Sequence, residues 1–142
     1  MINSASKSCI KASLKALALV AMLFAVAGCV DKSNPDRVEQ RAIERWNFLI
    51  EHKAESAYDY LSPGFRQTQS REAYAASMNN RPLQWKSVKF DKKDCDKDRC
   101  LARIALTYVV TMPGLTARPT ESTSTQAETW IFVDGDWYFL PK

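Results

Sequence analysis

The sequence predicts an α+β domain in which N-terminal helices pack on a curved antiparallel sheet. Two observations support this prediction. Apolar residues recur at a helical spacing in residues 35–79, whereas they alternate with polar residues in residues 101–112. In addition, Asp134-Gly135, a dipeptide typical of tight β-hairpin turns, separates two aromatic-rich runs. Helices followed by hairpin-linked strands are the order expected of an α+β fold.

The first predicted helix begins at Asn34-Pro35-Asp36, with Asn34 as its N-cap and Pro35 in its first turn, where a missing N–H costs nothing. Its charged residues, Arg45 among them, mostly fall on the polar side. Its apolar residues share one side at the 3.6-residue period: Val38, Ala42, Ile43, Trp46, Leu49 and Ile50. We therefore expect an amphipathic helix whose apolar face points into the domain.

Two further helices are expected before the sheet. The second covers residues 54–61 and is ended by Ser62-Pro63-Gly64, after which residues 65–68 are expected to be extended. Ser70 is a suitable N-cap for the third helix, which is expected to end near Asn79-Asn80.

A long strand with one buried face is predicted over residues 101–112, because apolar residues occupy one parity. They are Ala102, Ile104, Leu106, Tyr108, Val110 and Met112. Residues 115–125 are rich in Thr and Ser and lack an apolar period, which predicts an exposed loop. Residues 126–133 and 136–141 then form a hairpin. Its expected cross-strand neighbours are Phe132 with Trp137 and Ile131 with Tyr138.

The first strand, expected over residues 83–93, has an inconsistent parity. Leu83 and Trp85 share one parity, whereas Val88 and Phe90 share the other. Counting back from Cys95 opposite Cys100 pairs Trp85 with Val110 and Leu83 with Met112. One extra residue flips the parity of a strand, so we expect a β-bulge between positions 86 and 93.

A stretch near the N-terminus indicates where the domain resides. Val26-Ala27-Gly28-Cys29 resembles a bacterial lipobox, in which the cysteine is lipidated and becomes the mature N-terminus. Upstream, three lysines precede an apolar run over residues 16–27, which is shorter than the roughly 20 residues that span a membrane. The alternative is an ordinary secretory signal with an incidental cysteine. The resemblance implies a removed signal peptide (residues 1–28), a lipidated tether (residues 29–34) and one domain (residues 35–142).

The net charge and the cysteines limit the kinds of partner and bound group that we expect. The net charge of +4 falls to about +1 once the three signal-peptide lysines are gone, which gives no basis for nucleic-acid binding. Cys95 and Cys100 are then the remaining thiols of an exported domain, and we expect a disulfide between them. The alternative is half a metal site that recruits His52, the single histidine. We expect no bound metal or cofactor.

The order of the elements resembles the nuclear-transport-factor-two-like family, a cone-shaped α+β fold that includes ketosteroid isomerase and scytalone dehydratase. The residues that carry the resemblance are Ala57-Tyr58 and Leu61-Ser62-Pro63 in the helices, and Glu128-Thr129-Trp130 and Asp134-Gly135-Asp136-Trp137 in the sheet. The resemblance implies a pocket between helices and sheet. Function in the family ranges from enzyme to scaffold, so the fold assigns none.

Candidate pocket residues are apolar or aromatic: Trp46, Tyr58, Tyr108, Trp130 and Phe132. The enzymes of the family use a carboxylate or histidine as base, with Tyr58, Asp59 and Tyr60 as the nearest candidates here, but we expect these to pack or to be solvated and assign no catalytic residue. His52 lacks an evident triad partner.

The sequence therefore predicts a non-enzymatic binding or assembly module of the bacterial cell envelope, anchored through Cys29. Val30 after the cysteine favours the outer membrane, with the domain facing the periplasm. Its expected partner is a small apolar ligand or an envelope protein. The alternatives are an isomerase or dehydratase for a small apolar substrate, and a structural homodimer.

Overall fold

Residues 32–110 and 119–142 are described by the computed structural model, and all of them belong to one compact unit, Lys32–Lys142. The lipobox and Cys29 lie outside the described residues. The helical elements are α2 (Asp36–Ile50), α3 (Ala54–Ala57), the 3₁₀ helix η2 (Tyr58–Tyr60), α4 (Pro63–Thr68) and α5 (Arg71–Asn79). The strands are β1 (Leu83–Asp96), β2 (Arg99–Val110), β3 (Thr120–Val133) and β4 (Asp136–Leu140).

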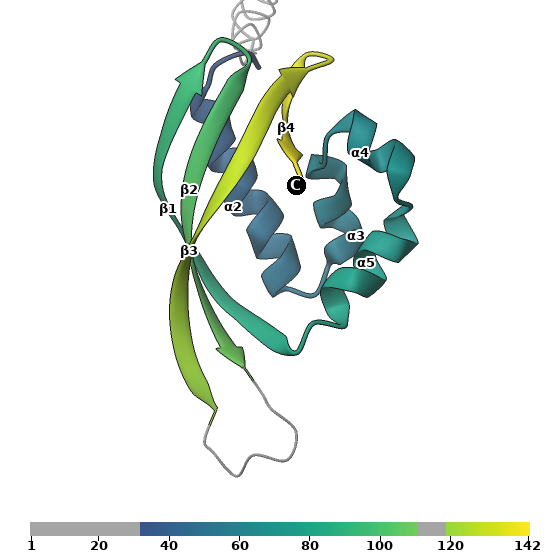
Figure 1. Ribbon diagram of the computed structural model, residues 1–142, viewed down its shortest axis with the longest axis vertical. Helices are drawn as coiled ribbons and strands as arrows, with labels where there is room; N and C mark the ends of the chain where they lie inside the picture. Colours follow the sequence, from purple (N-terminus) through teal and green to yellow (C-terminus); the bar gives the residue numbers. More distant parts are fainter. Residues whose placement is uncertain (1–31, 111–118) are drawn as a thin grey trace, which may run out of the picture. The chain divides into compact units, whose positions relative to one another are not determined.

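The four strands form one antiparallel sheet in the order β1-β2-β3-β4. Figure 1 shows the long strands β1, β2 and β3 bending around the helices, with α2 packed along the inner face of the sheet. The α+β class expected from the sequence, with helices on a curved antiparallel sheet, is confirmed.

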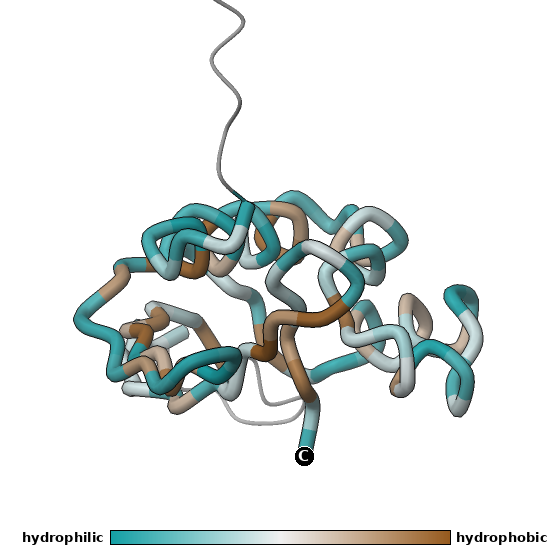
Figure 2. The backbone as a smooth tube through the Cα atoms, turned by 90° about the horizontal axis from the view of Figure 1, so that it is seen from above, coloured by the Kyte–Doolittle hydropathy of each residue, from teal (hydrophilic) through white to brown (hydrophobic). Residues whose placement is uncertain are grey.

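Helix α2 starts at the predicted Asn34-Pro35-Asp36 signal, but its N-cap residue is Pro35 and not Asn34 as expected. It begins at Asp36, whose backbone N–H donates to Asn34 Oδ1 over 2.9 Å. Hydrophobic and hydrophilic residues alternate along the helices (Figure 2). The buried face of α2 comprises Val38, Ala42, Trp46 and Leu49, but also Arg45, which the sequence placed on the polar side. The third predicted helix is confirmed as α5, with Ser70 Oγ accepting from the Ala73 N–H over 3.2 Å.

Helix α4 corrects the extended piece expected over residues 65–68. Ser62 and Pro63 do not only end the preceding segment, because they also start a new helix. Ser62 is the N-cap, its Oγ accepting from the Phe65 N–H over 3.4 Å, and Pro63 occupies the first turn. The Ser62 N–H donates to the Phe139 carbonyl over 2.8 Å, which ties the start of α4 to β4.

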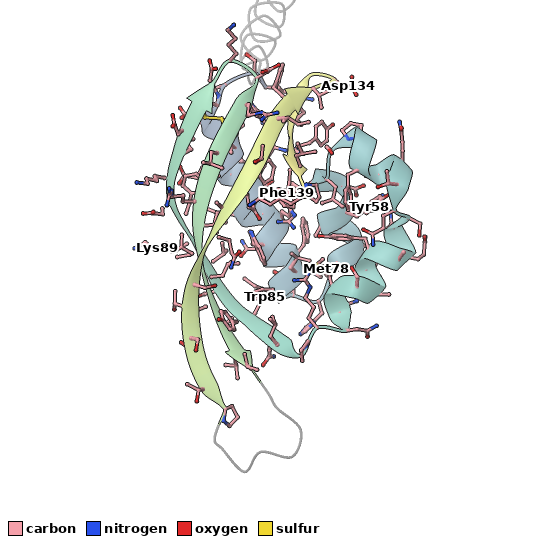
Figure 3. All side chains as sticks on the ribbon, in the orientation of Figure 1. Tyr58, Met78, Trp85, Lys89, Asp134 and Phe139 are labelled. Carbon is pink, nitrogen blue, oxygen red and sulfur yellow. A yellow bond between two sulfur atoms is a disulfide. The ribbon has the colours of Figure 1, made fainter. Side chains whose placement is uncertain are left out.

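The pairing of β1 with β2 contains two bulges. Register shifts leave Lys86 and Asp91 as extra residues of β1, so Trp85 pairs with Tyr108 and not with Val110. The predicted bulge is confirmed. The bulge at Lys86, between Trp85 and Val88, explains why Leu83, Trp85, Val88 and Phe90 all face inward, and the bulge at Asp91 brings Cys95 to the same face. Figure 3 shows Trp85 on the helix side of the sheet and Lys89 on the other side.

The cysteine prediction is confirmed at the far end of this pair. Cys95 lies directly opposite Cys100, and the two form a disulfide that closes the β1–β2 hairpin. Within residues 32–110 and 119–142, no group of three or more His, Cys, Asp or Glu side chains is placed to hold a metal ion.

The β3–β4 hairpin has the predicted register, with Phe132 opposite Trp137 and Ile131 opposite Tyr138. Asp134 (φ 51°) and Gly135 (φ 82°) both have positive φ, as a two-residue type I′ turn requires. The exposed loop expected over residues 115–125 is wrong from Thr120 onward, where β3 begins. This part of β3 is largely exposed, so its side chains need no apolar period. Residues 115–118 lie outside the described residues.

The core lies between the helices and the inner face of the sheet. Its largest fully buried side chains include Trp130, Trp137, Leu61, Ile104 and Leu106. On the outer face, Leu101 (43% exposed) is the one large hydrophobic residue classed as exposed among those described. Within the same residues, no helix is long and apolar enough to cross a membrane.

Candidate functional site

A cavity of about 500 Å³ opens between α2, α5 and the inner face of the sheet. Its apolar walls come from Trp46, Phe65, Tyr74, Met78, Trp85 and Phe139. Figure 3 places Met78, Trp85 and Phe139 between the sheet and the helices. The volume, and the aromatic walls interrupted by a few polar side chains, are those of a site for a small molecule.

Glu128 is the one carboxylate side chain among the lining residues. It projects inward from β3 and is 4% exposed. Its Oε1 accepts from Arg45 Nη1 and from Trp46 Nε1, both over 2.8 Å, and its Oε2 accepts from Trp130 Nε1 over 3.1 Å. Three N–H donors suit an ionised carboxylate, which can only accept. Glu128 therefore joins α2 to β3 from inside the core.

Arg45, from α2, is also 4% exposed, and its guanidinium is only partly used. Nη1 donates to Glu128, Nη2 lies 3.5 Å from Tyr74 Oη, and Nε has no hydrogen-bond partner among the described residues. The guanidinium carbon lies 4.1 Å from the centroid of the Phe139 ring and 5.1 Å from that of Trp46. These rings fix the position of the charge, while several N–H groups keep their donor capacity beside the cavity.

The cavity carries an excess of basic side chains. Arg81 and Lys142, both exposed, line it together with Arg45. Glu128, the one acidic side chain in the lining, is already paired with Arg45. An anion entering the cavity would therefore meet a favourable field.

The geometry suits binding better than proton transfer. A general base must have a free lone pair that points at the substrate. Glu128 already accepts three hydrogen bonds from core donors, of the about four that a carboxylate can accept, and the described residues that line the cavity include no His, Asp or Cys. The lining also contains Tyr74, whose hydroxyl lies beside Arg45 and can donate a hydrogen bond.

Of the candidate pocket residues, Trp46 lines this cavity, and the other four lie elsewhere in the fold. Tyr58 packs among the helices, with its hydroxyl donating to the Gln69 carbonyl over 2.6 Å. The Tyr108 ring meets Trp85 edge-on at 6.0 Å, and the Phe132 ring lies 5.5 Å from Trp137. Trp130 is fully buried, with its indole N–H on Glu128.

The other chemical candidates lie away from the cavity. Asp59 forms a two-point contact with Arg71, with distances of 2.6 and 3.1 Å. Burial, and then the hydrogen bond to Glu44, raise the pKa of Tyr60 to about 12. His52 is exposed just after α2, at φ 58°.

Sequence reasoning missed Arg45 and Glu128 as a pair. One signal was available: Arg45 adjoins Trp46 and lies one turn from Ala42 and Leu49, on the border of the apolar face. Its partner is 83 residues away, and only the folded sheet brings it near.

Two solved structures share the fold. A SEC-C motif containing protein from Rhodopseudomonas palustris has 12% identity over 79% of each chain, with a TM-score of 0.59. Another from Psychrobacter arcticus has 14% identity over 84% of each chain, with a TM-score of 0.55. A putative NTF2-like transpeptidase from Campylobacter jejuni has 17% identity over 78% of this chain and 100% of that chain. Its TM-score of 0.45 is too low to support a conclusion about this chain.

Neither a family model nor a curated protein matches the chain. At identities of 12% and 14%, the first two likenesses show the fold alone. The common ground with known proteins is therefore an architecture of helices on a curved antiparallel sheet.

Proposed function

We propose that this chain is a lipid-anchored, periplasm-facing binding module of the bacterial cell envelope, which holds a small ligand in the cavity and does no chemistry on it. The observation that carries the proposal is the cavity itself. It has a volume of about 500 Å³ and aromatic walls, and its one lining carboxylate is held by three core donors. An isomerase or dehydratase would need a free acid or base there.

The anchor rests on Val26-Ala27-Gly28-Cys29 and on where the fold begins. Trp137 Nε1 donates to the Ser33 carbonyl over 3.3 Å, so the folded unit already holds the chain at Ser33. Four residue steps separate Ser33 from Cys29, which is at most about 14 Å of extended chain. A lipidated Cys29 would therefore keep the domain close to the membrane surface.

A structural dimer formed through the outer face of the sheet has less support. That role needs an exposed apolar face. The outer face of β1 presents Lys86, Lys89 and Lys92, and that of β3 presents Thr123 and Thr125. These side chains favour contact with water.

The ligand site is tested with N-phenyl-1-naphthylamine, a neutral probe that fluoresces in apolar surroundings. The protein is residues 29–142 carrying Cys29→Ser, which contains the whole compact unit. We expect saturable binding by this protein and loss of binding in Met78→Trp, which fills the cavity. Leu101→Trp, on the outer face, is the matched control and should bind as the parent does. Equal binding by Met78→Trp would overturn the site.

Two further measurements test the rest of the proposal. Cys29→Ala should abolish incorporation of labelled fatty acid, and the parent should fractionate with outer membranes on a density gradient. Native ligand extracted from the purified protein should be recovered unchanged after incubation with fresh protein. A product formed by the parent and not by Met78→Trp would show an enzyme.

A further inference from the structure

We infer that the ligand is an amphipathic carboxylate, with an apolar body against the aromatic walls and its anionic group on Arg45. This inference rests on the proposed function and names the class of ligand for the same cavity. It does not follow from the apolar lining, which would suit a neutral molecule equally well. It follows from the donors that the protein leaves unused.

Arg45 is the first of these donors. A guanidinium has five N–H groups, and the described residues accept from two of its nitrogens, at 2.8 Å and 3.5 Å. Nε is buried without a partner, but so are Arg37 Nε and Arg41 Nε, and this atom does not set Arg45 apart. The unused donors are the second N–H of Nη1 and the second N–H of Nη2, for which the described residues provide no acceptor. Glu128 already accepts three hydrogen bonds, because Trp46 and Trp130 share its oxygens with Arg45. An acceptor from outside the protein would complete the set.

Tyr74 provides a second donor beside the first. Its side chain is buried (3% exposed), and its Oη lies 3.5 Å from Arg45 Nη2. No hydrogen bond donated by this hydroxyl is found within residues 32–110 and 119–142, so its proton remains available to a ligand. A planar carboxylate can take one N–H from Arg45 and the O–H from Tyr74 on its two oxygens.

The remaining lining matches the rest of such a molecule. Trp46, Trp85 and Met78 offer apolar contact to its body. Arg81, exposed in the cavity lining, would attract the anion during entry. A carboxylate also fits better than a phosphate ester, because Arg45 already serves Glu128, and a dianion would bring two further negative charges to this one buried cation.

Competition between matched ligands tests the inference. Decanoate and decanol share an alkyl chain and differ in charge, and each displaces N-phenyl-1-naphthylamine from the Cys29→Ser protein. We expect decanoate to displace the probe at a concentration at least about tenfold lower than decanol, a preference that falls with added salt. Equal displacement by the two would overturn the inference while leaving the cavity intact. Failure of the probe to bind at all would instead count against the proposed function. Stronger displacement by decyl phosphate than by decanoate would overturn the carboxylate class.

Variants locate the anion. Arg45→Met alone would leave Glu128 buried without its cation, so the variant to use is Arg45→Met with Glu128→Gln. In this double variant decanoate should lose its advantage over decanol, while probe binding persists. Tyr74→Phe should reduce the advantage several-fold, with Tyr58→Phe as the buried control that leaves it unchanged. Arg81→Gln should weaken decanoate alone, with Lys89→Gln on the outer face as its control. If the double variant fails to fold, unaltered decanoate preference in both Tyr74→Phe and Arg81→Gln overturns the assignment.

Discussion

Helix α2 places arginines at three successive turns, Arg37, Arg41 and Arg45, and its two ends use them differently. Near the start of the helix, Arg37 and Arg41 share one carboxylate, Asp136, at 3.5 and 3.0 Å, and these side chains are 13–21% exposed. One turn later, Arg45 pairs with Glu128 at 2.8 Å, and both are 4% exposed. Both ends of the helix form arginine–carboxylate ion pairs, but the pair at Arg45 is more deeply buried.

Depth decides what each group can do. At Asp136, two cations serve one anion, and all three side chains keep some contact with water, although Arg37 Nε and Arg41 Nε are buried without a partner. At Glu128, the carboxylate accepts hydrogen bonds from Arg45 and from two indoles, and the Arg45 side chain is almost completely shielded from solvent. A partly exposed arginine cluster thus fastens the helix to β4, whereas the buried one also leaves a place for a ligand.

The largest expected effect is that of Glu128→Gln. The glutamine side chain would keep the shape but leave the Arg45 charge buried without a counter-ion, and breaking such a pair costs about 3–5 kcal/mol. We expect the free energy of unfolding, measured by urea denaturation at pH 7, to fall by that amount. Adding Arg45→Met should restore much of the loss, because the uncompensated charge is then gone. If Glu128→Gln alone were as stable as the parent, burial would not determine how much this ion pair contributes to stability.

Removing the disulfide gives a reference value that involves neither arginine cluster. Cys95 and Cys100 close a short loop at the β1–β2 turn, so by the loop-entropy estimate Cys95→Ser with Cys100→Ser should cost about 2 kcal/mol or less. Thiol blocking before and after reduction, followed by mass spectrometry, should show both cysteines oxidised in the parent. Free thiols in the parent protein, purified without reductant, would contradict the pairing.

Local signals in the sequence predicted much of this fold. Asn34 and Ser70 marked helix starts, and Asp134-Gly135 fixed the last hairpin and its register, because each acts through neighbouring backbone. Ser62-Pro63-Gly64 misled, since the same residues that end one helix can cap the next. The first residues of β3 were missed because a strand that is largely exposed on both faces has no apolar alternation.

The site was harder to predict than the fold. A charged residue at the edge of an amphipathic face is solvated in most helices, so the position of Arg45 beside Trp46 was too weak a signal to predict its burial. Its burial depends on Glu128, which lies on a strand 83 residues later and whose own depth depends on sheet register. Trp46 was predicted from its apolar character alone. The helical and strand periods of a sequence do not predict which charged residues pair when they lie far apart in the chain.

A smaller effect is expected at the exposed end of the comparison, for Asp136→Asn. The asparagine side chain would keep an acceptor for the Trp137 N–H, which Asp136 now bonds at 2.9 Å, but the negative charge would be lost. Because Arg37 and Arg41 remain partly hydrated, we expect a loss of about 1 kcal/mol in the free energy of unfolding. Ligand binding in the cavity should not change. A loss as large as that of Glu128→Gln would remove the distinction between the two clusters.

The smallest effect is expected at a third pair of the same type. Asp59 bonds Arg71 at two points, as a carboxylate and a guanidinium can, but the Asp59 side chain is 56% exposed. The hydrogen bond from Arg71 holds the pKa of Asp59 below its usual value of 3.8. A carboxyl whose pKa is lowered by folding stabilises the folded state above its unfolded pKa, and this contribution disappears as the pH falls through the folded pKa.

Asp59→Asn should therefore lower the free energy of unfolding at pH 7 by at most about 1 kcal/mol, since exposed pairs are screened by water. The difference between parent and variant should begin to shrink as the pH falls below about 4, near the unfolded pKa, and should disappear once the pH is below the lowered pKa of the folded state. Urea denaturation at several pH values measures both. Asp94→Asn, at an exposed carboxylate of β1 that forms no ion pair in the part of the chain that the structure describes, is the control and should show no such trend. A difference that stayed constant with pH would mean that Asp59 acts through its shape, and burial would then not be what ranks the three pairs.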